Sequence, residues 1–152
     1  MPQKKPTKDT YFVAIKIFLE DSRGNFFITK DRFGDWDIPG GRLLTNEFAT
    51  PLHKVAERKL AEELGKSLKY SIAKEPVIFM RHERNEILPD GSRGKRRIFA
   101  LGYRAQYLGG DITLGDNHVK SQWAKPNVFK AEKYFTGGWL KGVKEYLKLR
   151  KK

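Results

Sequence analysis

The chain has 152 residues, of which 39% are hydrophobic and 32% charged, so it is long enough for one domain with a buried core and unlike a disordered chain. No apolar run approaches the roughly 20 residues of a bilayer-spanning helix, and the lack of cysteine excludes disulfides, thiolate metal sites and thiol nucleophiles. Lys and Arg outnumber Asp and Glu by 31 to 18, and a formal charge of +13 favours anionic partners such as nucleotides or nucleic acid.

The first quarter of the chain predicts an arm followed by short strands. Residues 1–9 are polar and basic, and we expect a flexible N-terminal arm. Tyr11–Leu19 and Phe26–Thr29 are rich in Val, Ile and Phe, as strands are, and the polar segment Asp21–Asn25 between them predicts a hairpin turn. Trp36–Ile38 predicts one more short strand.

A helix is predicted after Thr50-Pro51. Thr can cap the free amides of a first turn, and Pro is tolerated at the first helical position. Gly65 is a typical helix stop. Apolar residues at three- and four-residue steps predict the buried face of this helix: Leu52, Val55, Ala56, Leu60 and Leu64.

The second half predicts a long hairpin, a short strand and a closing helix. Val77–Met80 and Ile98–Tyr107 read as strands on either side of a turn at Pro89–Gly91. Gln122–Ala124 predicts a short strand, and an apolar stripe from Trp139 to Leu147 predicts a basic C-terminal helix. Strands before and after a central helix predict an α/β layered domain over residues 10–152.

The most specific pattern lies between residues 36 and 65, where the Trp36–Gly41 turn is followed by Glu47 and then by Arg58–Gly65. This pattern resembles the Nudix box, G-x5-E-x7-R-E-U-x-E-E-x-G-U with U apolar. The resemblance implies the Nudix fold, a mixed β-sheet sandwiched between α-helices. The residues that match the box by type are Gly41, Glu47, Arg58, Leu60, Glu62, Glu63 and Gly65.

Three features depart from the box. Ten residues, not seven, separate Glu47 from Arg58, Lys59 stands where the box has a metal-site Glu, and Lys66 replaces the last apolar residue. The longer loop raises the expectation that Glu47 and the Gly40-Gly41 carbonyls shift away from the helix.

The resemblance implies a magnesium-dependent hydrolase, with manganese as a second suitable ion. Glu62 and Glu63 would hold the metal and, with Arg58, form the catalytic group, because hard oxygen ligands suit Mg²⁺. Arg58 lies one helical turn before Glu62 and can orient it. By the same resemblance the Gly40-Gly41 turn would approach metal and substrate closely, and Glu47 would support the loop and the helix.

Lys59 leaves three interpretations open. It can repel metal from an otherwise sound site, it can bind the substrate phosphate as a fixed cation, or it can neutralise Glu63 and leave a site without hydrolysis. The plainer interpretation of the whole segment is an exposed helical face with the i,i+4 pairs Arg58–Glu62 and Lys59–Glu63, worth only about 0.2–0.5 kcal/mol each.

Outside the box the candidates are weaker. Many family members place a further Glu in the loop before a Trp-containing strand. Here Asn117 aligns loosely with it, next to Asp116, although Gly115–Asn117 also reads as an ordinary turn. Four other titratable side chains are candidates whose alternative is a solvated surface: His82, Glu83, Glu86 and His118.

For the substrate the sequence offers aromatic residues and one basic cluster. The aromatic side chains that could stack on a base, or belong to the core, are Phe33, Trp36, Tyr103 and Tyr107. The cluster Arg93–Arg97 lies beside the predicted hairpin tip and could contact polyphosphate or an RNA backbone without reading its sequence.

The sequence therefore predicts a Nudix-type hydrolase that cleaves a diphosphate linkage in a nucleoside diphosphate joined to another group. The alternative is a Nudix-fold protein that binds a nucleotide or RNA without cleaving it. A nucleotide-type small molecule is the expected partner, nonspecific RNA contact is a second possibility, no membrane is involved, and a cytoplasmic location is expected.

Overall fold

One mixed β-sheet organises residues 5–151, the part of the chain that this computed structural model describes. Residues 1–4 of the expected N-terminal arm lie outside the described residues, while residues 5–9 are exposed and have no helix or strand. No helix among residues 5–151 is long and apolar enough to cross a bilayer.

The strands and helices alternate along the chain as the sequence predicts for an α/β domain. The strands are Phe12–Glu20 (β1), Phe26–Asp31 (β2), Trp36–Asp37 (β3), Gly40–Arg42 (β4), Lys69–Ile72 (β5), Ile78–Ile87 (β6), Arg93–Gly109 (β7) and His118–Ala124 (β8). The helices are Leu52–Leu64 (α1) and Gly137–Arg150 (α2), with 3-10 turns at Thr45–Glu47 and Ala131–Lys133.

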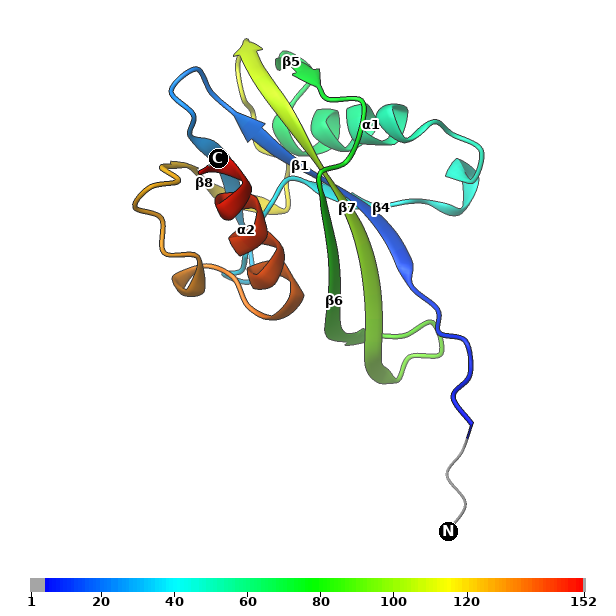
Figure 1. The fold of residues 1–152 in the computed structure, drawn as a ribbon. Coiled ribbons are helices and arrows are strands. Elements are labelled where there is room, and N and C mark those ends of the chain that lie inside the picture. Colours follow the sequence, from blue (N-terminus) through cyan, green and yellow to red (C-terminus); the bar gives the residue numbers. More distant parts are fainter. Residues whose placement is uncertain (1–4, 152) are drawn as a thin grey trace.

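The central pair of the sheet is β1 and β7, which run parallel from Phe12 opposite Ile98 to Glu20 opposite Gln106. The main path through the sheet is β3-β2-β1-β7-β5, and β4, β6 and β8 add to β1, β7 and β2, respectively. Every pairing except β1 with β7 is antiparallel. The β6–β7 hairpin extends beyond the body of the sheet (Figure 1).

The two helices cover opposite faces of this sheet (Figure 1). Successive side chains of a strand point to opposite faces, so Phe18 of β1 packs with α2 while Ile17 and Leu19 pack with α1. The apolar face predicted for α1 is buried at Val55, Ala56, Leu60 and Leu64. This layering confirms the predicted fold class, a mixed sheet between α-helices.

A buried carboxylate ties α2 to the sheet. Both oxygens of Glu20, at the end of β1, accept hydrogen bonds from Arg104 at 2.7 and 2.9 Å. The Tyr146 hydroxyl donates to the same carboxylate at 2.8 Å, and Arg150 in turn donates to Tyr146 at 2.7 Å. Burial is the main cause that raises the pKa of Tyr146, so this hydroxyl stays a donor.

The predicted strand pairs and helix stop are confirmed, with one error and two omissions. The β1–β2 and β6–β7 hairpins form, and Gly65 ends α1 with a φ of 90°. Thr50 was expected to cap α1, but Pro51 precedes the first helical residue and no side chain caps the helix. Strands β4 and β5 were not predicted, since Gly-Gly-Arg and Lys-Tyr-Ser-Ile have weak strand patterns.

Replacing the buried Leu60 should test the packing of α1 against the sheet. Leu60→Ala leaves a cavity beneath the helix, and we expect a loss of about 2–5 kcal/mol in the free energy of unfolding. The matched control is Phe48→Ala, because Phe48 is 97% exposed, and its change should stay within about 0.5 kcal/mol. Urea denaturation measures both, and equal losses would contradict the packing described here.

Candidate functional site

The turn before α1 depends on glycine at position 40. Gly40 lies opposite Lys16 in the β1–β4 pairing and has a φ of 144°, a conformation that favours glycine. A Cβ atom at this position would lie 1.9 Å from the Ile15 carbonyl oxygen and 2.8 Å from the Lys16 Cα. Only glycine therefore allows β4 to approach β1 closely.

Glu63 fastens the end of α1 to this turn. Its Oε2 accepts a hydrogen bond from the Gly40 N–H at 2.9 Å, and its side chain is 13% exposed. Its Oε1 lies 3.7 Å from Nε2 of His118, a side chain that is itself nearly buried. Burial raises the pKa of Glu63, against the opposing charges of Lys16 and Lys59.

Arg58 connects the loop to the helix. Its Nε and Nη2 donate to the two oxygens of Glu47, both at 2.7 Å, and its Nη1 donates to Glu62 at 2.9 Å. Glu47 also accepts the Leu44 N–H at 2.8 Å, which orders the loop. The three extra residues before Arg58 therefore do not move Glu47 away from the helix.

Lys59 lies against the glycine turn. Its Nζ is 3.3 Å from Oε2 of Glu62, while a Cβ on Gly41 would meet the Lys59 Cε at 2.1 Å and the Nζ at 2.6 Å. The absence of a side chain on Gly41 thus makes room for the lysine. The Lys59–Glu63 pair of the plainer interpretation does not form, because Glu63 turns toward Gly40 and Lys59 pairs with Glu62 instead.

Lys16 is a second cation beside the turn. Its side chain is 6% exposed and donates to both oxygens of Asp37, at 2.9 and 3.0 Å, and to the Ile38 carbonyl at 3.2 Å. Its Nζ also lies 5.1 Å from the centre of the Trp139 ring. Such partners offset the loss of hydration that burial of an ammonium group causes.

The glycine turn, Lys16 and the α1 side chains Arg58, Lys59 and Glu62 line a cavity of about 550 Å³, which we call the cationic cavity. Arg42 spans its rim and donates to both oxygens of Glu86, at 2.9 and 2.8 Å. Five Lys and Arg side chains line the cavity against three Asp and Glu side chains, so an anion is the favoured occupant. The charged lining residues are Lys16, Arg42, Arg58, Lys59, Arg84, Asp37, Glu62 and Glu86.

A second cavity, of about 370 Å³, adjoins the first and shares Asp37, Arg84 and Trp139 with it. We call it the aromatic cavity, because its lining includes Trp36, His82, Tyr134 and Trp139. The His82 and Trp139 rings stack at a centroid distance of 4.5 Å. The backbone N–H of Trp139 donates a hydrogen bond to Nδ1 of His82 at 3.3 Å. A free amide of the first turn of α2 is thereby satisfied.

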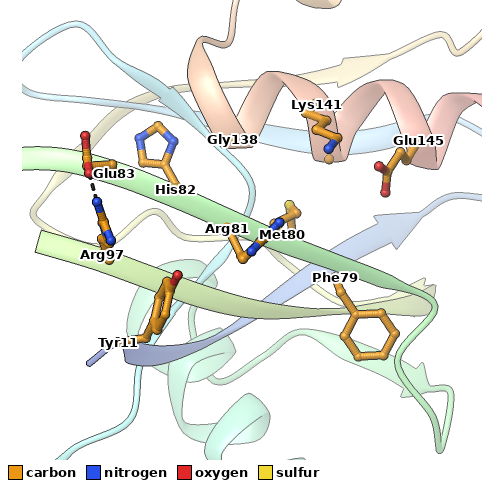
Figure 2. A pocket seen from close by; sticks show the side chains of 11 residues that line it. Tyr11, Phe79, Met80, Arg81, His82, Glu83, Arg97, Gly138, Lys141 and Glu145 are labelled. Carbon is orange, nitrogen blue, oxygen red and sulfur yellow. Dashed lines mark hydrogen bonds and ion pairs between the residues drawn. The ribbon is translucent and has the colours of Figure 1, made fainter. Parts of the chain in front are cut away.

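The weaker sequence candidates lie in different parts of the structure. Glu86 lines the cationic cavity, whereas Glu83 pairs with Arg97 and lines a separate cavity of about 320 Å³ between α2 and the β6–β7 hairpin (Figure 2). Asp116 and Asn117 lie in an exposed turn, and their backbone oxygens accept hydrogen bonds from Arg32. The alternative given for His118, a solvated surface position, is wrong, because its side chain is nearly buried next to Glu63.

Of the four aromatic candidates, only Trp36 lines either of the two adjoining cavities. Phe33 is 89% exposed, and Tyr103 belongs to the core under α1. Sequence reasoning did not single out Lys16, Arg42, Arg84 or Trp139 as site residues. For Lys16 a signal existed, since it interrupts an otherwise apolar strand.

The expected magnesium site was tested against the donors that the fold provides. Glu63 is absent from the lining of the cationic cavity, and both oxygens of Glu62 are already paired, one with Arg58 and one with Lys59. Within residues 5–151 no three His, Asp or Glu side chains are grouped to hold a metal ion. A divalent ion 4 Å from one ammonium is repelled by about 2 kcal/mol in water and about 8 at an effective dielectric of 20. The donor set in this arrangement does not fit a resident magnesium ion.

Arg58→Met should destabilise the fold in a pH-dependent way. The Arg58 guanidinium, with the Leu44 N–H, holds the pKa of Glu47 below its ordinary value. A carboxyl whose pKa is lowered on folding stabilises the fold above its unfolded pKa, and this contribution disappears as the pH falls through the folded value. We therefore expect a lower melting temperature for the variant at neutral pH, by several degrees, and a gap that narrows below about pH 4.

Lys54→Met is the matched control for this experiment. Lys54 lies on the same helix, its side chain is 59% exposed, and its partner Glu57 is also exposed. Its melting temperature should follow the parent at every pH, since an exposed pair contributes little. Thermal denaturation by circular dichroism makes the measurement, and a gap for Arg58→Met that is the same at all pH values would show that Glu47 is not the group responsible.

Comparisons with solved structures agree with the geometry of the fold. A MutT protein from Methanosarcina mazei Go1 has a TM-score of 0.67 and 16% identity, over 97% of this chain and 100% of that one. A Nudix hydrolase from Nitrosomonas europaea has a TM-score of 0.68 and 18% identity, over 95% of this chain and 74% of that one. An ADP-ribose pyrophosphatase from Streptococcus suis has a TM-score of 0.63 and 13% identity, over 94% of both chains. No family model and no curated protein matches the sequence.

Proposed function

We propose that this chain, which has the fold of the Nudix hydrolases, binds the diphosphate group of a nucleotide-type ligand in the cationic cavity. The observation that carries the proposal is the set of five cationic side chains around one cavity, with Lys59 placed against the Gly41 turn. Guanidinium and ammonium groups are the side chains that recognise phosphate oxygens.

The size and surroundings of the cavity support this ligand class. Its volume of about 550 Å³ lies within the range of small-molecule sites, about 300–1,000 Å³. The adjoining aromatic cavity is lined by aromatic side chains next to the cations, so a base or another flat group could lie there while the diphosphate meets the cations. The solved relatives include a protein described as an ADP-ribose pyrophosphatase, whose substrate has this composition.

Hydrolysis of the bound diphosphate is a second candidate function, and one observation favours it. Arg58, Glu62 and Glu63 occupy their box positions, and Arg58 holds Glu62 by a hydrogen bond of 2.9 Å at the cavity. The sequence alone placed hydrolysis ahead of binding. We place binding first, because both oxygens of Glu62 are engaged by cations and Glu63 does not line the cavity.

Three broader expectations stay proposals. The first is a single domain over residues 10–152, and the second is a cytoplasmic location. The third is nonspecific RNA contact through the basic surface, which weakens sharply with salt if it occurs. In the Arg93–Arg97 cluster, Lys95 and Arg97 already pair with Glu83, which lowers the charge available to RNA.

Arg84→Met should weaken nucleotide binding without destabilising the fold. Arg84 lines both cavities, its side chain is 52% exposed, and its contact with Glu86 is long, at 3.8 Å. Losing one charge-assisted contact should lower the affinity for ADP-ribose or a nucleoside triphosphate about tenfold. Isothermal titration calorimetry measures the change, and thermal denaturation confirms that the variant is folded.

The control for this test is Arg93→Met, which removes the same charge from an exposed position at the start of β7, outside both cavities. It should bind nucleotides as the parent does. Equal losses in Arg84→Met and Arg93→Met would show that only the general field of the basic surface attracts the ligand, and the proposed site would be wrong.

Hydrolysis is tested on a panel of ADP-ribose, dinucleoside polyphosphates, nucleoside triphosphates and 5′-triphosphorylated RNA, with magnesium, manganese or EDTA. If the second candidate is right, phosphate-containing products appear and are lost in Glu62→Gln, which keeps the shape of the side chain but removes its charge. Binding without products at high protein concentration would leave binding as the function. Chromatography of the nucleotides gives the readout.

A further inference from the structure

The position of Lys59 carries an inference that rests on, and deepens, the proposed function. We propose that the Lys59 ammonium takes the place of a divalent metal ion in the cationic cavity, so that a diphosphate binds there without magnesium or manganese. The sequence left the role of this lysine open between repelling metal, binding phosphate and neutralising Glu63. Its contacts support phosphate binding.

The first argument is the number of hydrogen-bond donors that remain available. An ammonium has three N–H donors. Among the described residues, the Lys59 ammonium has one hydrogen-bond acceptor, Glu62 at 3.3 Å. Lys16 is engaged by Asp37 and Ile38, and Arg58 by Glu47, Glu62 and the Arg42 carbonyl. Lys59 therefore keeps two N–H donors for a ligand, whereas four of the five N–H donors of Arg58 are used.

The second argument is that the ammonium is held in place before a ligand arrives. The Lys59 side chain is only 20% exposed, and its last atoms occupy the space that a side chain on Gly41 would fill. A long flexible cation normally loses rotamer freedom when it binds, and this restriction reduces that loss. The phosphate would meet a fixed charge next to the backbone of the turn.

The third argument concerns the carboxylates. A divalent metal ion here would need carboxylate oxygens as ligands, but Lys59 neutralises Glu62 directly and Glu63 accepts a hydrogen bond from the Gly40 N–H. Both carboxylates thus have partners within the protein, and their attraction for a metal ion is reduced. Charge balance for the diphosphate then comes from Lys59 together with the field of Lys16 and Arg58.

Calorimetry with ADP and with inorganic pyrophosphate tests the inference, in EDTA and in excess magnesium. The parent should bind in EDTA, and magnesium should leave the affinity unchanged or lower it, since the ion competes for the same oxygens. Lys59→Met should lower the affinity in EDTA at least about tenfold, the effect of losing one charge-assisted contact. Lys54→Met, with the same charge change on the exposed side of α1, should bind as the parent does.

A second variant moves the ammonium without removing its charge. Gly41→Ala places a Cβ where the flexible end of Lys59 now lies, so the lysine shifts while the backbone keeps its conformation. We expect Gly41→Ala to remain folded and to lose affinity in EDTA as Lys59→Met does. Wild-type affinity in both variants would overturn the inference, because neither the charge nor its position would then matter.

The outcomes separate the two proposals. Binding in magnesium but not in EDTA would overturn the inference and leave the proposed function standing. No binding of either probe under both conditions would overturn both. Lys59→Glu gives a further separation: if the lysine replaces the metal, this variant loses binding in EDTA and regains it only with magnesium or manganese.

Discussion

The close approach of β4 to β1 is the constraint on which the site depends. A side chain at Gly40 would collide with the backbone of β1, so the turn can lie there only because this residue has none. Once the turn is in place, its amide at Gly40 binds Glu63 and fixes the end of α1. The helix then presents Arg58, Lys59 and Glu62 to the cationic cavity.

Electrostatics inside the cavity follow from this geometry. Glu47 holds Arg58 through both of its oxygens, and Arg58 in turn directs Glu62 toward Lys59. Glu63, one residue further along the helix, points to a different environment, where burial raises its pKa. Two adjacent carboxylates therefore acquire unlike roles, one paired with cations at the cavity and one fastening the backbone.

The sequence was sufficient to predict local elements and the type of fold. The apolar steps of α1, the Gly65 stop and the two hairpins rest on short-range chemistry, and the box with its glycine turn indicated the layered architecture that the solved relatives share. Strand β4 could not be predicted from propensity, because its sequence Gly-Gly-Arg becomes a strand only through pairing with β1.

The cavity itself depends on strand register, which one sequence does not reveal. Lys16, Arg42 and Arg84 come from three strands that are far apart in the chain, and their meeting follows from which residues lie opposite each other. The pairing of Lys59 was also left open, since helical spacing alone allowed Glu62 or Glu63, and Glu63 is instead bound to the amide of Gly40. A contact between residues far apart in the chain thus determines which helical side chains pair, and helical spacing alone does not reveal it.

The ion pair between Arg42 and Glu86 has a consequence for selectivity. It joins β4 to the β6–β7 hairpin across the rim of the cavity, with both oxygens engaged. Glu86, like Glu62, is thus a counter-ion to the cations of the cavity that belongs to the protein itself. An incoming anion must exchange with these tethered carboxylates rather than enter an empty positive field. Chloride, with one diffuse charge, competes poorly with a carboxylate held at high local concentration, whereas a polyanion replaces several partners at once. If the cavity binds anions as proposed, its built-in counter-ions would favour multivalent anions over chloride.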